Sequence, residues 1–258
     1  MAVCRRDNKW YGYSPDLGDV RDHYAVDRKK VFRLKSGALP SSVDLRPLMP
    51  PVYDQGQLGS CTGNAIAGAI EYDRAKQKLT KLMPSRLFIY YNERVIEGTI
   101  SEDAGAQIRD GIKSVNQVGA CSEISWPYQI NQFAVKPKPS CYTSAKRHQA
   151  VSYARVDQTT DAVKRILASG FPIVFGFTVY DYFESDQMAK NGVLKMPAKG
   201  EGVVGGHAVL AVGYTPTHVL VRNSWAADWG INGYFLMPFE YLLNPDLSDD
   251  LWVATLVK

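Results

Sequence analysis

The sequence predicts an α+β protein with two lobes, because its first half has the pattern of helices and its second half the pattern of strands. Apolar residues recur at helical spacing over Cys61–Tyr72, Pro84–Val95 and Ala104–Val118. After about residue 170, runs of β-branched and aromatic residues alternate with glycine, proline and asparagine. No internal repeat is visible. We expect a helical N-terminal lobe over 39–148 and a β-rich, barrel-like lobe over 149–258.

Residues 1–38 mix both signs of charge with scattered aromatic residues and keep no helical or strand period for long. They predict an extension that lies on a folded core rather than forming one. Four prolines between Leu39 and Tyr53 predict extended chain or loop, since proline fixes φ and lacks an amide donor. The glycine-rich stretch 54–60 that follows is typical of a turn.

The second half divides into short elements separated by turn residues, and residues 136–140, with two prolines, indicate a loop before it. The pattern predicts a helix over Asp161–Ala168 and strands over Ile173–Val179, His207–Val212, Val219–Arg222, Tyr234–Met237 and Trp252–Val257.

Composition excludes several classes of protein. The 258 residues are 45% hydrophobic and 22% charged, which excludes a disordered tail, a collagen and a disulfide miniprotein. The net charge of +4 makes no case for nucleic-acid binding. No apolar run approaches the length of about 18 residues that a membrane helix needs. The first fifteen residues lack the apolar core of a signal peptide, so either the protein is cytosolic or a leader has been removed.

The four cysteines and four histidines fit no common zinc or redox spacing, so no metal or other cofactor is expected. Cys61 differs from the other cysteines because it stands between a glycine-rich turn and a helix. A thiol at a helix N-terminus has its pKa lowered by the peptide dipoles, which favours the nucleophilic thiolate. Taken alone, a buried and inert cysteine is the commoner situation.

A nucleophilic thiol requires a base. His207 is the best candidate, because it follows Gly205 and Gly206 and begins an apolar strand that would hold the imidazole rigidly. The other three histidines lie in charged or turn-like surroundings. Asn223, next to Trp225 at the end of another strand, is placed to orient an imidazole by a shielded hydrogen bond.

These motifs together resemble the papain-like cysteine peptidases. The resemblance rests on Gly59–Cys61, Gly206–Ala208, Asn223–Trp225 and Trp229–Tyr234, and on Leu39–Arg46, which is similar to the start of the mature enzymes. The interval from Cys61 to His207 falls inside the family's range of about 130 to 150 positions. Each motif alone is a weak signal, but together they are specific, and they cover about residues 39–258.

The resemblance implies a cleft between the lobes and an endopeptidase with Cys61, His207 and Asn223 as a catalytic triad. It gives Gln55 the oxyanion hole. It also implies that several residues bind substrate: Gly105, Ala106, Ile108, Ala208 and Trp225. Ile108 and Ala208 would favour an apolar side chain two residues before the scissile bond. We expect a monomer acting on peptides or proteins, with no cofactor, secreted or lumenal. The alternatives are an acyl transferase with the same fold and a non-catalytic peptide-binding protein.

The sequence departs from the family pattern at four places. Leu58 stands where the family's first cysteine would be, so the usual disulfide there is absent, and Thr62 replaces an aromatic residue. Ala106 replaces one of two glycines. A disulfide between Cys121 and Cys141 is expected. Residues 1–38, with aromatics at positions 10, 11 and 13, are either a short propeptide over the active site or a permanent decoration, and the second is slightly favoured.

Overall fold

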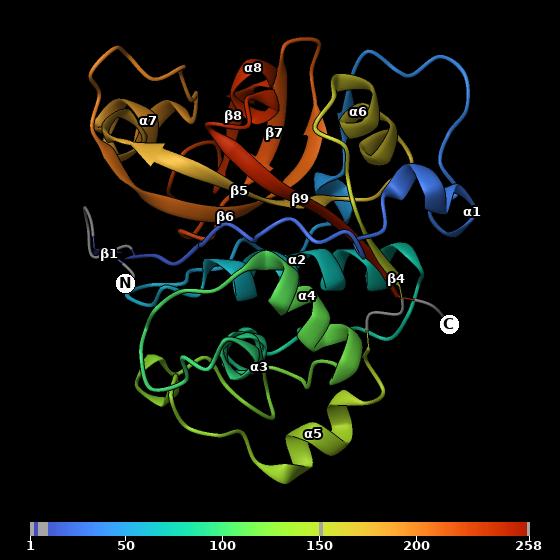
Figure 1. Ribbon diagram of the computed structural model, residues 1–258, viewed down its shortest axis with the longest axis vertical. Coiled ribbons are helices and arrows are strands. Elements are labelled where there is room, and N and C mark those ends of the chain that lie inside the picture. The colour runs from blue at the N-terminus through green and yellow to red at the C-terminus, as the bar shows by residue number, and fades with distance from the viewer. Residues whose placement is uncertain (1–2, 5–9, 150–151, 257–258) are drawn as a thin grey trace.

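The computed structural model describes residues 3–4, 10–149 and 152–256. It places a layer of helices below a twisted antiparallel sheet, with the N-terminal segment running between them (Figure 1). The helices of the lower lobe are α2 (Cys61–Lys76), α3 (Arg86–Glu97), α4 (Ile108–Gln117) and α5 (Pro139–Ala145). The three long helices match the predicted ones, except that α4 begins four residues later, because Gly105 adopts a φ of +74° that a helix excludes.

Helix α2 forms because its small residues let it pack on several sides at once. It is buried almost throughout and lies against α3, α4 and the sheet. Gly63 is required here, because a Cβ would come within 2.9 Å of the Arg86 carbonyl oxygen. The helix thus forms the central wall between the lobes, with Cys61 at its first position.

The upper lobe is built on one antiparallel sheet of seven strands. Its strand order is β4-β9-β5-β6-β7-β8, and β3 pairs with β6. The strands are β3 (Val43–Asp44), β4 (Ser152–Arg155), β5 (Ile173–Tyr180), β6 (Val203–Tyr214), β7 (His218–Arg222), β8 (Tyr234–Pro238) and β9 (Ser248–Thr255). Five of them fall where strands were predicted, although Val257 lies outside the described residues.

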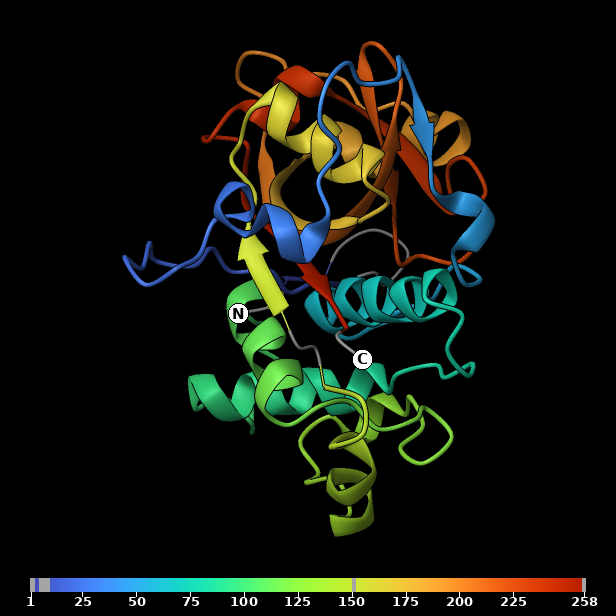
Figure 2. The ribbon, with the colours of Figure 1, turned by 90° about the vertical axis from the view of Figure 1, so that its right-hand side faces the viewer.

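Short helices cover the sheet, and only α6 was predicted. They are α6 (Thr160–Ala168), α7 (Asp186–Asn191) and α8 (Phe239–Leu243), and the 3-10 turn η5 is Asp181–Glu184. The expected loop at 136–140 is wrong at its end, since Pro139 begins α5; proline is well suited to the first turn of a helix, where no amide donor is needed. Strands β4 and β9 run down to the helical lobe and connect the two halves (Figure 2).

The N-terminal segment has little regular structure of its own. It contains the paired strands β1 (Val3–Cys4) and β2 (Trp10–Tyr11), then extended chain, the turn η2 (Ala25–Arg28) and the short helix α1 (Lys29–Phe32). Figures 1 and 2 show its first part passing between α2 and the sheet, and α1 lying beside the upper lobe. Phe32 anchors that end, because its ring is fully buried against Phe171.

Candidate active site

The thiol of Cys61 lies at the junction of the lobes. Its side chain is fully buried, and its sulfur accepts a hydrogen bond from the backbone N–H of Ala208 in β6 at 3.4 Å. Burial raises the pKa of Cys61 to about 12, although the N–H groups of Ala208, Gly12 and Thr62 act in the opposite direction. The helix position predicted a lowered pKa. In this covered state desolvation is the larger effect, so the thiol is held neutral.

His207 and Asn223 meet as predicted, from strand β6 and from the end of β7. His207 Nε2 lies 2.8 Å from Asn223 Oδ1. Because that oxygen also accepts the Ser224 N–H at 2.8 Å, it is the carbonyl end of the amide, and the imidazole proton lies on Nε2. His207 Nδ1 is buried and has no hydrogen-bond partner within the described part of the chain.

Aromatic rings enclose this imidazole. The Trp225 ring stacks on it with centroids 5.2 Å apart and an interplanar angle of 25°, and Tyr11 and Phe177 contact it edge-on. Burial lowers the pKa of His207 to about 4, while the bond to Asn223 raises it by a smaller amount. The pair is therefore neutral and shielded from water. Trp225 lies where the resemblance predicted, over the His207–Asn223 bond.

Gln55 is fully buried and held at both ends of its amide. Its Nε2 donates to the Leu58 carbonyl at 3.0 Å, and its Oε1 accepts from Ser224 Oγ at 2.5 Å. Its backbone N–H also donates to the Ser224 carbonyl, at 2.9 Å. Gln55 thus connects the turn before Cys61 to the loop that carries Asn223, two pieces far apart in the sequence.

The backbone groups expected to bind substrate are occupied by the N-terminal segment. Ala106 N–H donates to the Gly12 carbonyl at 2.7 Å, and the Ala106 carbonyl accepts from Ser14 N–H at 3.1 Å. Tyr13 lies between them in a parallel bridge to Ala106, and its N–H donates to the Gly206 carbonyl at 3.1 Å. Ile108 and Ala208 belong to the same buried cluster as Tyr13.

Gly12 donates a backbone hydrogen bond to Cys61 and packs tightly against the turn before it. A Cβ on Gly12 would lie 1.7 Å from the Gly59 carbonyl oxygen, and a Cβ on Gly105 would lie 2.2 Å from that of Gly12. The segment is therefore packed between the backbone at Gly59 and the backbone at Gly105, and neither Gly12 nor Gly105 has room for a side chain.

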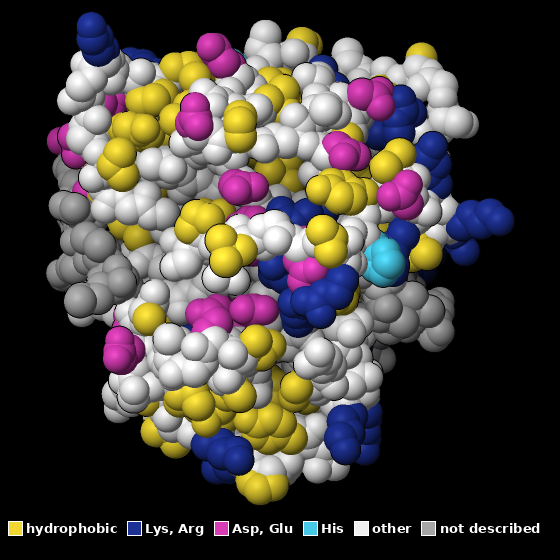
Figure 3. Space-filling view, in the orientation of Figure 1, with side chains coloured by type: hydrophobic (Ala, Val, Ile, Leu, Met, Phe, Trp, Pro, Cys, Tyr) yellow, Lys and Arg dark blue, Asp and Glu magenta, His cyan; other side chains and the backbone are white. Residues whose placement is uncertain are grey.

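A cluster of five charged residues, three buried and two half-buried, fastens the segment, and no local pattern in the sequence predicted it. Arg155 donates to Asp22 at 2.8 Å, to Asp16 at 2.9 Å and to Asp250 at 3.1 Å. Arg109 donates to Asp22 at 2.7 Å. Acidic and basic side chains gather at mid-height in Figure 3, where the segment passes between the lobes in Figure 1. We call these five residues the Asp–Arg cluster.

Charge balance within the Asp–Arg cluster explains one shifted pKa. Three carboxylates face two guanidinium groups, and Asp16 is buried with one oxygen that has no hydrogen-bond partner among the residues described. Burial and the neighbouring Asp250 raise the pKa of Asp16 to about 7, while Arg109 and Arg155 lower it by less. The docked segment therefore binds a proton that free Asp16 would release near pH 4.

Two departures from the family pattern have structural counterparts that sequence reasoning missed. Asp103 accepts the Gly59 N–H at 3.1 and 3.0 Å with its two carboxylate oxygens, and also accepts a hydrogen bond from the Tyr90 hydroxyl. It thus tethers the turn next to Leu58, where the family's disulfide is absent. Thr62 donates to the buried Glu93 at 2.6 Å, and burial raises the pKa of that carboxyl well above its usual range.

The predicted disulfide is not formed. Cys121 and Cys141 are buried free thiols that contact each other, and the Cys141 thiol donates to the Ser125 carbonyl at 3.6 Å. Both belong to an apolar cluster of the helical lobe, where burial raises the pKa of the Cys121 thiol. Both thiols fill space in this cluster without a crosslink.

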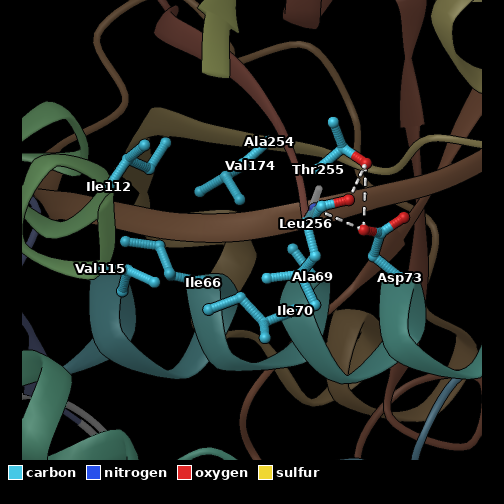
Figure 4. Close-up of a pocket in the computed structure, with 10 residues that line it drawn as sticks. All are labelled: Ile66, Ala69, Ile70, Asp73, Ile112, Val115, Val174, Ala254, Thr255 and Leu256. Atoms are coloured by element: carbon cyan, nitrogen blue, oxygen red, sulfur yellow. Dashed lines mark hydrogen bonds between the residues drawn. The ribbon is translucent and has the colours of Figure 1, made fainter. Parts of the chain in front are cut away.

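The open pocket shown in Figure 4 is not the active site. It lies behind α2, where apolar side chains of α2 and α4 face the end of β9, and its volume is about 10 Å³, room for about one water molecule. Asp73 closes one side by accepting from Leu256 N–H at 2.7 Å and from Thr255 Oγ1 at 3.1 Å.

Within the described ranges, no helix is long and apolar enough to span a membrane, and no three or more His, Cys, Asp or Glu side chains gather to hold a metal.

A two-lobed α+β fold with a buried thiol, hydrogen-bonded to the strand that carries an imidazole–amide pair, is the arrangement of the class of cysteine peptidases. Residues 39–241 match the papain family of cysteine proteases, and the chain belongs to that family as a cysteine peptidase, a hydrolase. Xylellain, a cysteine protease from Xylella fastidiosa, superposes with a TM-score of 0.90 and 42% identity over the whole of both chains.

Relatives from distant sources match as well. An uncharacterized peptidase C1-like protein of Acanthamoeba polyphaga mimivirus is 44% identical over 94% of this chain and 86% of its own length. Cathepsin K of Gallus gallus is 31% identical over 78% of this chain, which spans 60% of that relative. The match to the Xylella protein covers the whole of this chain, and therefore includes the N-terminal segment.

Proposed function

We propose that this protein is a latent endopeptidase that hydrolyses peptide bonds through Cys61, His207 and Asn223 once its N-terminal segment has left the cleft. The observation that carries the proposal is the hydrogen bond between His207 and Asn223 beneath Trp225. The Cys61 sulfur lies close by, since it accepts a hydrogen bond from the backbone N–H of Ala208, the residue after His207. This arrangement leaves His207 Nδ1 as the nitrogen that can take the thiol proton.

The chemistry follows from these positions. When the cleft is open to water, the desolvation that holds Cys61 neutral is relieved, and the thiolate pairs with protonated His207. The thiolate attacks the scissile carbonyl carbon. Cys61 N–H and a Gln55 amide hydrogen stabilise the oxyanion, and removal of one such donor typically costs about a hundredfold in rate. His207 protonates the leaving amine and then activates the water that hydrolyses the thioester.

The docked segment blocks the reaction without being a substrate. Gly12 directs its N–H at the sulfur, while its carbonyl oxygen accepts from Ala106. A thiolate attacks a carbonyl carbon and cannot attack an amide nitrogen, so the segment is not cleaved at this point. Tyr11 covers the imidazole at the same time. These contacts favour a propeptide-like role for residues 10–22 over a permanent decoration.

The experiment compares the full chain, its Gly12→Ala variant and each combined with Cys61→Ala. We expect weak hydrolysis of a peptide library by the full chain, stronger hydrolysis by Gly12→Ala, and none by any chain with Cys61→Ala. A peptide epoxide should label Cys61 alone, and Cys121→Ala should leave the labelling unchanged. Product analysis in the presence of an added amine separates hydrolysis from acyl transfer. Turnover that survives Cys61→Ala would contradict the proposal.

Substrate, compartment and assembly are parts of the same proposal. The papain family supports peptide or protein substrates for this chain. A secreted or lumenal location and a monomeric state remain proposals by analogy with the family. Detection of the active protein in culture supernatant, at the mass of one chain, would support both.

A further inference from the structure

The side chain of Tyr13 occupies a fitted pocket beside the nucleophile. The residue is only 8% exposed, and its hydroxyl donates to Asp250 Oδ2 at 2.8 Å. Its ring lies directly on Gly176, where a Cβ would come within 2.0 Å of the ring carbon that carries the hydroxyl. Any side chain at position 176 would fill the place of the ring.

The remaining walls match an aromatic ring in shape and polarity. Gly206 lies against the ring edge, since a Cβ there would be 3.1 Å from Tyr13 Cδ1. Ile108, Ala208 and Trp252 belong to the same apolar cluster as Tyr13. The polar end of the pocket is the Asp250 carboxylate, so the pocket has an apolar body and one acceptor at its far end.

The pocket lies next to the reacting sulfur. Gly12, whose N–H faces Cys61, precedes Tyr13 in the chain, and the Tyr13 N–H is bonded to Gly206, next to His207. A peptide that replaces the segment and uses the same backbone groups would place a side chain here, close to its scissile bond. The identity of that side chain depends on the charge at the end of the pocket.

An acidic group at the end of a pocket would ordinarily favour lysine or arginine, but here the carboxylate already has a cationic partner, Arg155. Asp250 Oδ1 accepts from Arg155 Nη1 at 3.1 Å, and Arg109 lies in the same cluster. When the segment leaves, Asp16 and Asp22 leave with it. Asp250 then keeps its pair with Arg155, Arg109 has lost its partner Asp22, and Asp249, which also faces this site, is exposed to solvent. A second cation would gain little, whereas a neutral hydroxyl still finds its acceptor.

We infer that this pocket selects a tyrosine side chain of the peptide substrate, with Asp250 accepting the phenolic hydrogen bond. The inference rests on the proposed peptidase function and names the substrate class of that site. Tyr13 then acts as an internal copy of the preferred side chain, within a segment that its backbone direction protects from cleavage.

The first arm of the test needs no peptidase activity. It measures the rate at which iodoacetamide alkylates Cys61 in the full chain, in Tyr13→Phe, in Asp250→Gly and in the double variant. Glycine is chosen because Asp250 has a φ of +55°, which glycine adopts without strain. We expect Tyr13→Phe to raise the rate at least tenfold in the parent chain and to have no effect when Asp250 is Gly, since both changes remove the same hydrogen bond.

The second arm measures kcat/KM of the full-length Tyr13→Ala variant on matched peptides with Tyr, Phe, O-methyltyrosine, Leu or Arg at each of the four positions before the scissile bond. We expect tyrosine to exceed Phe and O-methyltyrosine at least tenfold at one position. Adding Asp250→Asn should retain most of this preference, because an amide oxygen still accepts the bond. Adding Asp250→Gly should remove it.

The outcomes separate the two proposals. Equal hydrolysis of the Tyr and Phe peptides, or a preference for Arg, would overturn the tyrosine pocket while the peptidase function stands. Additive effects of Tyr13→Phe and Asp250→Gly on alkylation would overturn it as well. If the two variants are coupled but no peptide is cleaved, the phenol pocket is supported and the proposed function fails.

Discussion

The N-terminal segment contacts the rest of the molecule in two regions that differ in chemistry. Over Cys61, residues 11–14, none of which is charged, are held by backbone hydrogen bonds and close packing between glycines. A few residues further on, the Asp–Arg cluster holds the segment by buried ion pairs to both lobes. The first region covers the active site, and the second fastens the cover.

The difference in chemistry implies a difference in response: the contacts over Cys61 should be insensitive to pH and salt, whereas the Asp–Arg cluster should be sensitive to both. Backbone bonds and steric fit change little with pH or salt, whereas a buried cluster with one carboxylate in excess gains or loses a proton as pH changes. Release of the segment should therefore be controlled at the Asp–Arg cluster.

Breaking the Asp–Arg cluster should have the largest effect. Arg155→Met leaves three carboxylates facing only Arg109 in the docked state, whereas release of the segment exposes Asp16 and Asp22 to water. Loss of one partner of a buried pair costs about 3 kcal/mol, equal to about a hundredfold in the docking equilibrium. We expect a rise of that order in the rate of Cys61 alkylation. Arg21→Met is the matched control, because Arg21 is exposed and its side chain pairs with Asp19 on the same segment. Equal rates in the two variants would contradict the fastening role.

Breaking the steric fit should have the next largest effect. In Gly12→Ala the new methyl group would overlap the Gly59 carbonyl oxygen, so the segment must move away from Cys61. We expect basal peptide hydrolysis to increase about tenfold or more. Gly18→Ala is the control, since a Cβ at Gly18 meets nothing within 4 Å. Unchanged hydrolysis in Gly12→Ala would mean that the segment does not limit access.

Docking of the N-terminal segment should depend on pH through the protonation of Asp16. The docked pKa of Asp16 is raised to about 7 from an ordinary value of 3.8, so protonation favours the docked state. Docking is therefore strongest near pH 4 and weakens as pH rises toward 7, by up to about tenfold per unit, with no further change above. The ratio of Cys61 alkylation rates, full chain over Asp16→Asn, cancels the titration of the thiol and should rise over this range. A ratio that stays constant would exclude Asp16 as the titrating group.

The smallest effect is expected from Asp103, which holds the turn before Cys61 beneath the N-terminal segment. Asp103→Ala removes the acceptor of the Gly59 N–H and loosens the turn that positions Cys61. In the Gly12→Ala chain we expect kcat to fall about tenfold with KM little changed, because substrate contacts are retained. Asp103→Asn should recover part of the loss, since its amide oxygen can accept the same bond. A rise in KM at constant kcat would instead place Asp103 in substrate binding.

Much of the site could be predicted from the sequence because its chemistry needs particular residue types in local settings. Cys61 was recognisable at the start of a helix, His207 beside two glycines, and Asn223 next to Trp225. The structure places all three where the motifs indicated. The elements that were missed are short: α7 and α8 have only six and five residues, too few to show a period.

The pKa of Cys61 and the disulfide between Cys121 and Cys141 show the limit of such reasoning. The dipole argument for Cys61 was sound for an exposed helix end, but it could not include a segment that buries the thiol. The two bystander cysteines do lie together, yet as thiols. In both cases the outcome depends on what surrounds the sulfur, and that surrounding comes from distant parts of the chain.

The sequence by itself was enough to predict the fold class and to single out Cys61, His207 and Asn223, because each prediction depends on local spacing and on residue chemistry. Only the tertiary structure decided that the N-terminal segment lies over Cys61, that Tyr13 meets Asp250, and that Asp16 joins Arg155. Tyr13 and Asp250, and Asp16 and Arg155, are more than a hundred positions apart, and charged residues in an irregular segment look solvated until the fold buries them. Ion pairs and close backbone contacts of that kind leave no period in a sequence.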